Sequence, residues 1–156
     1  METKTTIREY IRFTFIVLFI VLPIRFWIAQ PFIVSGASMV PTFENGDYLI
    51  IDELSYHLRT PQKGEVIIFR YPLDPSKFFI KRIIGVPGDT VEINGGKILL
   101  KDNEYYVLGD NRNNSLDSRI WGTLDRNLIV GRALVRLWPI TDMSLLPGQD
   151  AENYDQ

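Results

Sequence analysis

The most restrictive feature of this 156-residue chain is an apolar segment that occupies residues 13–32. Its 20 residues would form an α-helix about 30 Å long, which matches the hydrocarbon thickness of one bilayer. Arg25 and Gln30 interrupt the segment near its far end, where a long side chain can reach the headgroups, and Pro23 is a candidate kink. The segment therefore predicts a membrane helix followed by a separate domain.

Two other interpretations compete with a membrane anchor. A buried core helix is disfavoured because little of the remaining chain could surround a helix that is apolar on all sides. A cleaved signal peptide needs small residues at Ala-x-Ala spacing, whereas Trp27-Ile28-Ala29 begins with a bulky side chain. We therefore assign residues 13–31 to an uncleaved transmembrane anchor.

The charge next to the anchor predicts its orientation. Three basic residues precede it: Lys4, Arg8 and Arg12. Because basic residues that flank a span favour the cytoplasmic side, residues 1–12 should be cytoplasmic and the remainder of the chain extracytoplasmic. The expected location is the cell (plasma) membrane, crossed once.

The rest of the chain has the pattern of a β-rich domain. Seven short apolar runs between turn signals are predicted strands, at residues 48–51, 65–70, 78–84, 90–93, 97–100, 105–108 and 129–138. Asn94-Gly95-Gly96 predicts a hairpin between two of them, and residues 52–59 a short helical turn. We expect a mainly β fold, with a coiled antiparallel sheet in residues 32–148 and a flexible acidic tail at 149–156.

Composition excludes several classes of function. The formal net charge is -2 and the chain has no block of Lys or Arg, so nucleic-acid binding has no electrostatic support. The absence of cysteine excludes disulfides, thiolate metal sites and a cysteine nucleophile. The one histidine, His57, rules out multi-histidine metal clusters and leaves a Ser-His-Asp triad a single candidate base.

Ser38 is the candidate nucleophile. It lies within the string VSGASMVPT at residues 34–42, just after the predicted membrane exit. A serine in a glycine-containing loop is most often an ordinary turn residue. Here, however, Gly36 removes a side chain where a substrate backbone would approach, and Pro41 stiffens the other side. The Ser38 N–H is also a candidate oxyanion donor.

Lys81 is the candidate general base. It opens the string KRIIGVPGD at residues 81–89, and a lysine on a strand usually lies at a solvated edge. Apolar residues at 78–80 and 83–84 flank it, so we expect burial to favour the neutral amine that a base requires. Bringing the pKa of a lysine to 7 takes roughly 4.6 kcal/mol of destabilisation of the charged form. Arg82 is expected on the opposite face of the strand.

A third string, GDNRNNSLDSR at residues 109–119, would be an ordinary turn if it stood alone, and Asp117 with Arg119 an ordinary surface ion pair. In this order, with Gly46-Asp47 as a shorter fourth match, the strings resemble the motif boxes of bacterial type I signal peptidase. The match is to the short, single-anchor form of this leader peptidase family, and it extends from the anchor to Arg119. The resemblance implies the β-sheet fold of a Ser-Lys protease.

The resemblance also implies a role for each matched residue. Ser38 corresponds to the nucleophile, Lys81 to the general base, and Ser115 to the serine that orients the lysine amine. Further supporting positions are Gly36, Asp110, Arg112 and the ion pair of Asp117 with Arg119. Shallow pockets for small P1 and P3 side chains are implied at five apolar residues: Phe32, Val34, Met39, Phe79 and Ile80.

The chain departs from the family pattern in two ways. Gly36 stands where some members carry a serine whose hydroxyl assists the oxyanion hole, so the second oxyanion donor is left open. The sequence also lacks the second membrane span and the large extra domain of longer members, and is similar to the compact forms.

These features predict a membrane-anchored serine endopeptidase that removes N-terminal signal peptides from exported preproteins after Ala-x-Ala-like sites. No cofactor, metal or nucleic acid is expected. The expected partners are preprotein signal peptides and membrane lipid, with the enzyme itself a monomer. One rival is a self-cleaving Ser-Lys regulator, but such proteins carry a basic DNA-reading domain. The other is a catalytically inactive, membrane-anchored β-domain that binds exported proteins, against which the intact Ser38 and Lys81 argue.

Overall fold

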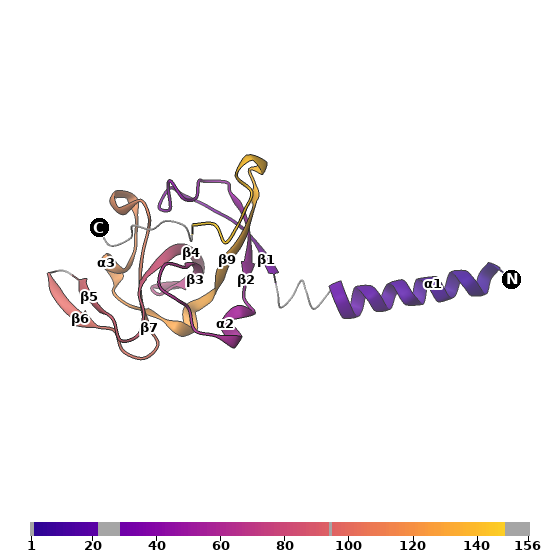
Figure 1. Cartoon of the computed structure of the whole chain (residues 1–156), viewed down its shortest axis with the longest axis horizontal. Coiled ribbons are helices and arrows are strands. Elements are labelled where there is room, and N and C mark those ends of the chain that lie inside the picture. Colours follow the sequence, from indigo (N-terminus) through magenta and orange to yellow (C-terminus); the bar gives the residue numbers. More distant parts are fainter. Residues whose placement is uncertain (1, 22–28, 94, 149–156) are drawn as a thin grey trace.

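The computed structural model describes residues 2–21, 29–93 and 95–148. Its main body is an eight-stranded sheet with the strand order β1-β2-β9-β3-β4-β7-β8, and β10 lies beside β9 (Figure 1). The strands of this sheet are β1 (Ala29–Ile33), β2 (Tyr48–Asp52), β3 (Val66–Tyr71), β4 (Asp74–Gly85), β7 (Glu104–Leu108), β8 (Leu124–Asp125), β9 (Ile129–Trp138) and β10 (Ser144–Leu145). All of their pairings are antiparallel, which confirms the predicted mainly β, antiparallel fold.

The remaining elements are short and lie at the margins of this sheet. β5 (Thr90–Ile93) and β6 (Gly96–Leu99) form a separate two-stranded hairpin, as the turn signal between them predicts. The helices of this domain are α2 (Ser55–Leu58), η3 (Arg112–Asn114), α3 (Ser118–Trp121), η4 (Arg126–Leu128) and η5 (Ile140–Asp142). Each of the seven predicted strands is present, and α2 falls within the predicted helical turn.

Two strand boundaries differ from the expectation. β4 begins at Asp74 because the β3–β4 hairpin closes at the pair Tyr71–Asp74, ahead of the apolar run. β1 occupies residues assigned above to the membrane anchor, and it pairs with β2 from Ala29 opposite Asp52 onward. Apolarity alone does not separate the end of a membrane helix from an edge strand, and Pro31 is compatible with an edge. Residues 29–31, which the sequence analysis assigned to the anchor, are therefore part of the sheet in the described structure.

The N-terminal part consists of α1 (Glu2–Ile16) and a short π-helix, η1 (Val17–Val21), which lie apart from the sheet in Figure 1. Large apolar side chains along it are exposed, among them Ile11, Phe13, Phe15, Leu18 and Phe19. Within the described residues, no helix combines the length and the apolarity needed to cross a membrane. Part of the predicted anchor, residues 22–28, and the predicted tail, residues 149–156, lie outside the described residues.

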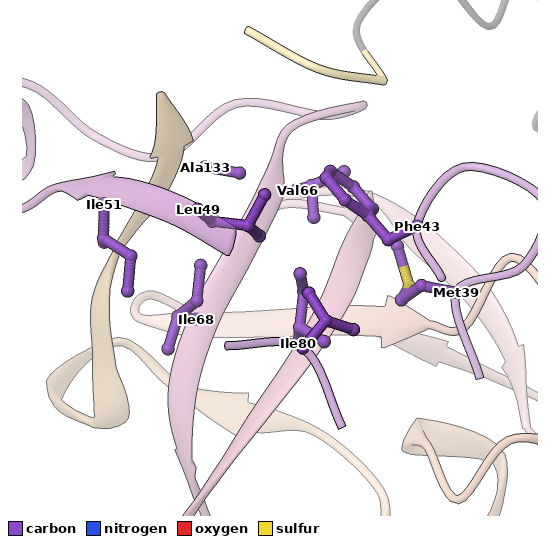
Figure 2. Close-up of a cluster of buried hydrophobic side chains, with 9 residues drawn as sticks. Met39, Phe43, Leu49, Ile51, Val66, Ile68, Ile80 and Ala133 are labelled. Carbon is purple, nitrogen blue, oxygen red and sulfur yellow. The ribbon is translucent and has the colours of Figure 1, made fainter. Parts of the chain in front are cut away.

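Buried side chains cover both faces of the sheet. Figure 2 shows one cluster, which contains Val34, Met39, Phe43, Leu49, Ile51, Val66, Ile68, Ile80 and Ala133. Along β3, Val66 and Ile68 enter this cluster, whereas Ile67 and Phe69 enter a second one on the other face. Burial on both faces explains why this run is continuously apolar. The same alternation sends the neighbouring side chains of β4 to opposite faces.

Candidate active site

The Ser38 hydroxyl and the Lys81 amine are hydrogen-bonded although 43 residues separate them in the chain. Lys81 Nζ donates to Ser38 Oγ at 2.8 Å and to the carbonyl oxygen of Ile80 at 2.8 Å. Ser38 lies on the loop between β1 and β2, and Lys81 lies within β4. The sheet thus brings the two candidate catalytic residues into direct contact.

The conformation of the loop before Ser38 requires a glycine. Gly36 has a φ of 94°, in the left-handed region that residues with a side chain rarely adopt. Its N–H donates to Asn45 Oδ1 at 2.9 Å, and Gly46 N donates to Val34 O at 2.9 Å. These contacts tie the segment before Ser38 to the turn that leads into β2.

Lys81 is almost completely enclosed, with 4% of its surface exposed. Burial lowers the pKa of its amine to about 8, while the carboxylates of Asp117 and Asp110 act in the opposite direction. Among the described residues, no carboxylate lies within ion-pair distance of this amine. The neutral form is therefore accessible near neutral pH, as a general base requires.

The string at residues 109–119 packs directly against the loop that carries Ser38. Asn111 N donates to Ser38 O at 3.0 Å, and Asn111 Nδ2 donates to Ala37 O at 3.1 Å. A Cβ atom at Gly109 would collide with Ser38 O and with Ser115 Oγ, so only glycine permits this approach. Sequence reasoning missed the roles of Gly109 and Asn111, although both lie within the matched string.

Ser115 lies beside Gly109 and therefore close to the Ser38 loop. Its hydroxyl is buried and forms no hydrogen bond of standard geometry with the described residues. It is near enough to Asp117 to help lower the pKa of that carboxyl. The hydrogen bond to the Lys81 amine that the family resemblance implies is not formed in this structure, where the amine donates to Ser38 and Ile80.

Asp117 and Arg119 form an ion pair whose acidic partner is fully buried and whose basic partner is 40% exposed. Asp117 accepts hydrogen bonds from Arg119 Nε and Nη2, each at 2.9 Å, and from Gly109 N at 3.1 Å. Although burial acts to raise it, these hydrogen bonds hold the pKa of Asp117 below its ordinary value. Arg119 Nη2 also donates to Arg112 O at 2.6 Å. The pair therefore connects the end of this loop to Gly109 and Arg112 near its beginning.

Asp110 pairs with Arg82, a contact that the sequence analysis did not find. Arg82 is fully buried, and its Nε and Nη2 donate to the two Asp110 oxygens at 2.8 and 2.6 Å. The Thr42 hydroxyl donates to the same carboxylate at 2.6 Å. Arg112, although it lies in the same loop as Asp110, donates to Gly109 O at 2.8 Å.

A cavity of about 460 Å³ lies beside the Ser38–Lys81 pair. Its lining consists of Phe32, Ser35, Gly36, Ala37, Ser38, Lys77, Phe78, Phe79, Ile80, Lys81, Asn114 and Leu116. Phe32, Phe79 and Ile80 belong to the predicted substrate-binding set. Val34 and Met39, from the same set, are turned into the buried cluster of Figure 2 and are not part of this lining.

Several lining residues were not anticipated from the sequence. Lys77 could have been found, because residues 77, 79 and 81 share one face of β4. Asn114 and Leu116 belong to the third string but carry no family role in the sequence analysis. His57 lies elsewhere, on α2, where its exposed ring contacts the Glu53 carbonyl oxygen.

A serine hydroxyl bonded to a buried amine at the wall of a cavity, on an antiparallel β-sheet domain, is an arrangement suited to a hydrolase that attacks through serine. A family model described as signal peptidase, peptidase S26, matches residues 7–105 and 96–138. The chain belongs to this signal peptidase family. The family consists of serine endopeptidases that process signal peptides, so the chain is an enzyme with preproteins as substrates.

Two similar sequences agree with this membership. The chain is 36% identical over 163 residues to the probable signal peptidase I-1 of Synechocystis sp., covering 85% of this chain and 83% of the relative. It is 40% identical over 120 residues to the mitochondrial inner membrane protease subunit 1 of Xenopus tropicalis, covering 73% and 72% of the two chains. A solved structure of a signal peptidase I from Enterococcus faecalis matches with 25% identity and a TM-score of 0.41, over 47% of this chain and 97% of that one.

Proposed function

We propose that this chain is a membrane-anchored signal peptidase in which Ser38 is the nucleophile and Lys81 is the general base. The observation that carries this proposal is the 2.8 Å hydrogen bond between Ser38 Oγ and Lys81 Nζ, made by an amine that is almost fully buried. Burial supplies the neutral amine, and the hydrogen bond supplies the path for the proton.

The reaction then proceeds in two steps. Neutral Lys81 removes the Ser38 proton as Oγ attacks the scissile carbonyl carbon, and the ammonium that results protonates the leaving amine when the C–N bond breaks. This leaves an acyl-Ser38 ester and a neutral Lys81. The same amine next takes a proton from water, whose oxygen attacks the ester, and returns that proton to Ser38 Oγ. No metal or cofactor takes part.

The residues around this pair have supporting roles. The Ser38 N–H is assigned as one oxyanion donor. Ser115, whose buried hydroxyl lies beside Gly109, is assigned to orient the Lys81 amine during turnover. Asp117 with Arg119 stabilises the third string internally. Asp110 connects that string to Arg82 of β4 and to Thr42 of the Ser38 loop. None of these carboxylates exchanges a proton with substrate in this scheme.

The cavity beside Ser38 favours small side chains at P1 and P3. Phe32, Phe79, Ile80 and Leu116 give it apolar walls. Apolar walls of fixed shape exclude bulk and disfavour charge, so cleavage after Ala-x-Ala-like sites follows from fit. Val34 and Met39 belong to the buried cluster that also contains Ile80 and packs against Phe32, so they support these two wall residues.

The apolar stretch that precedes β1 is proposed to anchor the enzyme in the plasma membrane, with residues 1–12 cytoplasmic. Exposed apolar side chains on α1 and η1, such as Phe13 and Phe19, are consistent with lipid contact in this part of the chain. The catalytic domain then lies outside, where the signal peptides of exported preproteins are presented.

The test is cleavage of a preprotein by the purified full chain in detergent, with the cut site read by mass spectrometry. We expect cleavage after an Ala-x-Ala-like site, covalent labelling of Ser38 by a serine acylating agent, and neither in Ser38→Ala. Rejection of bulky or charged P1 residues by roughly 10² is expected. Binding of preprotein without cleavage would favour the inactive β-domain, and a preference for Lys, Arg or Phe at P1 would contradict the assignment.

A further inference from the structure

The ring of Phe79 faces the Lys81 amine from two positions earlier on β4. Lys81 Nζ lies 5.3 Å from the centroid of this ring, within the range in which an aromatic face attracts a cation. The two residues share one face of the strand because side chains alternate along it. The face of the Phe79 ring therefore packs against the Lys81 amine, which is the general base of the proposed mechanism.

Three other aromatic side chains hold the Phe79 ring in this position. Tyr71 stacks on it with centroids 4.5 Å apart and planes 15° apart, and Phe69 meets it nearly edge-on at 6.2 Å and 73°. Trp121 packs against both of these supports, 6.4 Å from Tyr71 and 5.9 Å from Phe69. The supports come from β3 and α3, so the orientation of the ring is fixed from two elements.

We propose that Phe79 is a positioning residue that raises the proton affinity of Lys81 through the face of its ring. The ring has two opposite effects: it excludes water, which favours the neutral amine, and its negative face attracts the ammonium. An aliphatic side chain at position 79 would retain the first effect and lose the second. The ring thus helps Lys81 to hold the proton taken from Ser38 until the leaving amine receives it.

Other groups also act on Lys81, and they must be separated from the ring. Asp117 and Asp110 are the carboxylates whose charges favour the ammonium. Lys77 lies on the same face of β4 and in the same cavity, and is paired with Asp74 at 3.0 Å. A substitution at position 79 changes none of these charges, so a change in the titration of Lys81 reports on the ring.

The direct test is an NMR titration of the full chain in detergent, with carbon-13-labelled lysine and Lys81→Arg to assign the Lys81 signal. Phe79→Leu is expected to lower the titration midpoint of Lys81 by about 0.5 to 1 pH unit, and Phe79→Met to lower it in the same direction. The matched control is Phe78→Leu, because the Phe78 ring lines the same cavity but faces Arg70 at 4.8 Å and not Lys81. This control should leave the midpoint unchanged.

Two results would overturn the proposal. An unchanged midpoint in Phe79→Leu would show that the ring face contributes nothing, and a raised midpoint would show that the ring acts by keeping out water. Tyr71→Leu, which removes the stacking partner, is expected to lower the midpoint by less than Phe79→Leu. The catalytic consequence rests on the proposed function, but the titration does not. A shifted Lys81 midpoint in a chain that cleaves no preprotein would contradict only the proposed function.

Discussion

Lys81 and Arg82 are neighbouring cations on β4, and both are buried, with 4% and 0% of their surfaces exposed. Arg82 is held by both oxygens of Asp110. The Lys81 amine instead donates to a hydroxyl and a carbonyl oxygen, neither of which carries a charge. β4 thus holds one buried cation in an ion pair and another, the proposed general base, with no carboxylate at ion-pair distance among the described residues. The carboxylate partner distinguishes the two cations, and the degree of burial does not.

The two arrangements should affect stability in opposite directions. A buried ion pair is strongly destabilising to break, because the partner left behind is a buried, uncompensated charge. Lys81 has a pKa of about 8 in the folded chain against an ordinary value of 10.5, so the unfolded chain binds more protons between these pH values. Stability is therefore reduced by about 3 kcal/mol below pH 8, and this penalty disappears as the pH rises toward 10.5.

The largest expected effect is on catalysis by Lys81. Lys81→Ala removes the base, and Lys81→Arg replaces it with a guanidinium that stays protonated, so both should lose roughly 10³-fold or more in kcat/KM. The measurement is preprotein cleavage by proteins whose native fold is verified by circular dichroism. Activity that survives in Lys81→Arg would contradict the role assigned to the amine.

The next largest effect is expected on stability, from loss of the ion pair between Arg82 and Asp110. Asp110→Ala removes the two carboxylate hydrogen bonds of a fully buried guanidinium and is expected to lower the free energy of unfolding by about 3 to 5 kcal/mol. Urea denaturation checks this. The control is Asp102→Ala, at an exposed turn position, which should stay within about 0.5 kcal/mol of the unchanged protein. Equal unfolding free energies of the two variants would show that the Arg82–Asp110 pair does not stabilise the fold.

Asp117→Ala should produce a smaller loss that combines stability and activity. It removes a buried carboxylate that accepts hydrogen bonds from Gly109 N and from Arg119 N, Nε and Nη2, for an expected loss of about 1 to 3 kcal/mol in unfolding free energy at pH 7. Because folding lowers the pKa of Asp117, its contribution is present above the ordinary pKa and is lost as the pH falls through the folded value. The stability difference should therefore shrink in acid. Full activity with unchanged stability would remove Asp117 from the supporting set.

The smallest effect is expected at His57. Its ring is exposed on α2, away from the Ser38–Lys81 cavity, and its hydrogen bond is to the Glu53 carbonyl oxygen, so His57→Ala should keep near-normal turnover. Stability should change by no more than about 0.5 kcal/mol. Turnover that vanishes in His57→Ala while it survives in Lys81→Arg would reverse the assignment of the base.

The sequence predicted the parts of the molecule that depend on local pattern. Short apolar runs between turn signals located β2–β7 and β9, and the three strings identified the signal peptidase family that the comparisons confirm. β1 was missed because its residues are apolar and continuous with the stretch before them, while its strand character comes from pairing with β2. Long-range pairing of this kind leaves no local signal.

Contacts between residues of separate strings also could not be predicted from the sequence. Asp110 lies 28 residues after Arg82, and nothing in either string indicates that they pair. Val34 and Met39 are apolar members of the Ser38 string, and only the turn of the loop decides that they face the core and not the cavity. The burial of Lys81 could be predicted because its apolar neighbours are adjacent in sequence. The lack of a carboxylate paired with its amine could not.

We propose that Lys81 is reactive because it is buried with no carboxylate at ion-pair distance among the described residues, and that this burial lowers stability. The most direct measurement compares the unfolding free energies of the unchanged chain and Lys81→Met from pH 7 to pH 10. We expect Lys81→Met to have the larger unfolding free energy at pH 7. The difference between the two proteins should decrease as the pH rises from 8 toward 10.5. A Lys81→Met protein that is less stable at pH 7, or a difference that does not change with pH, would contradict the claim.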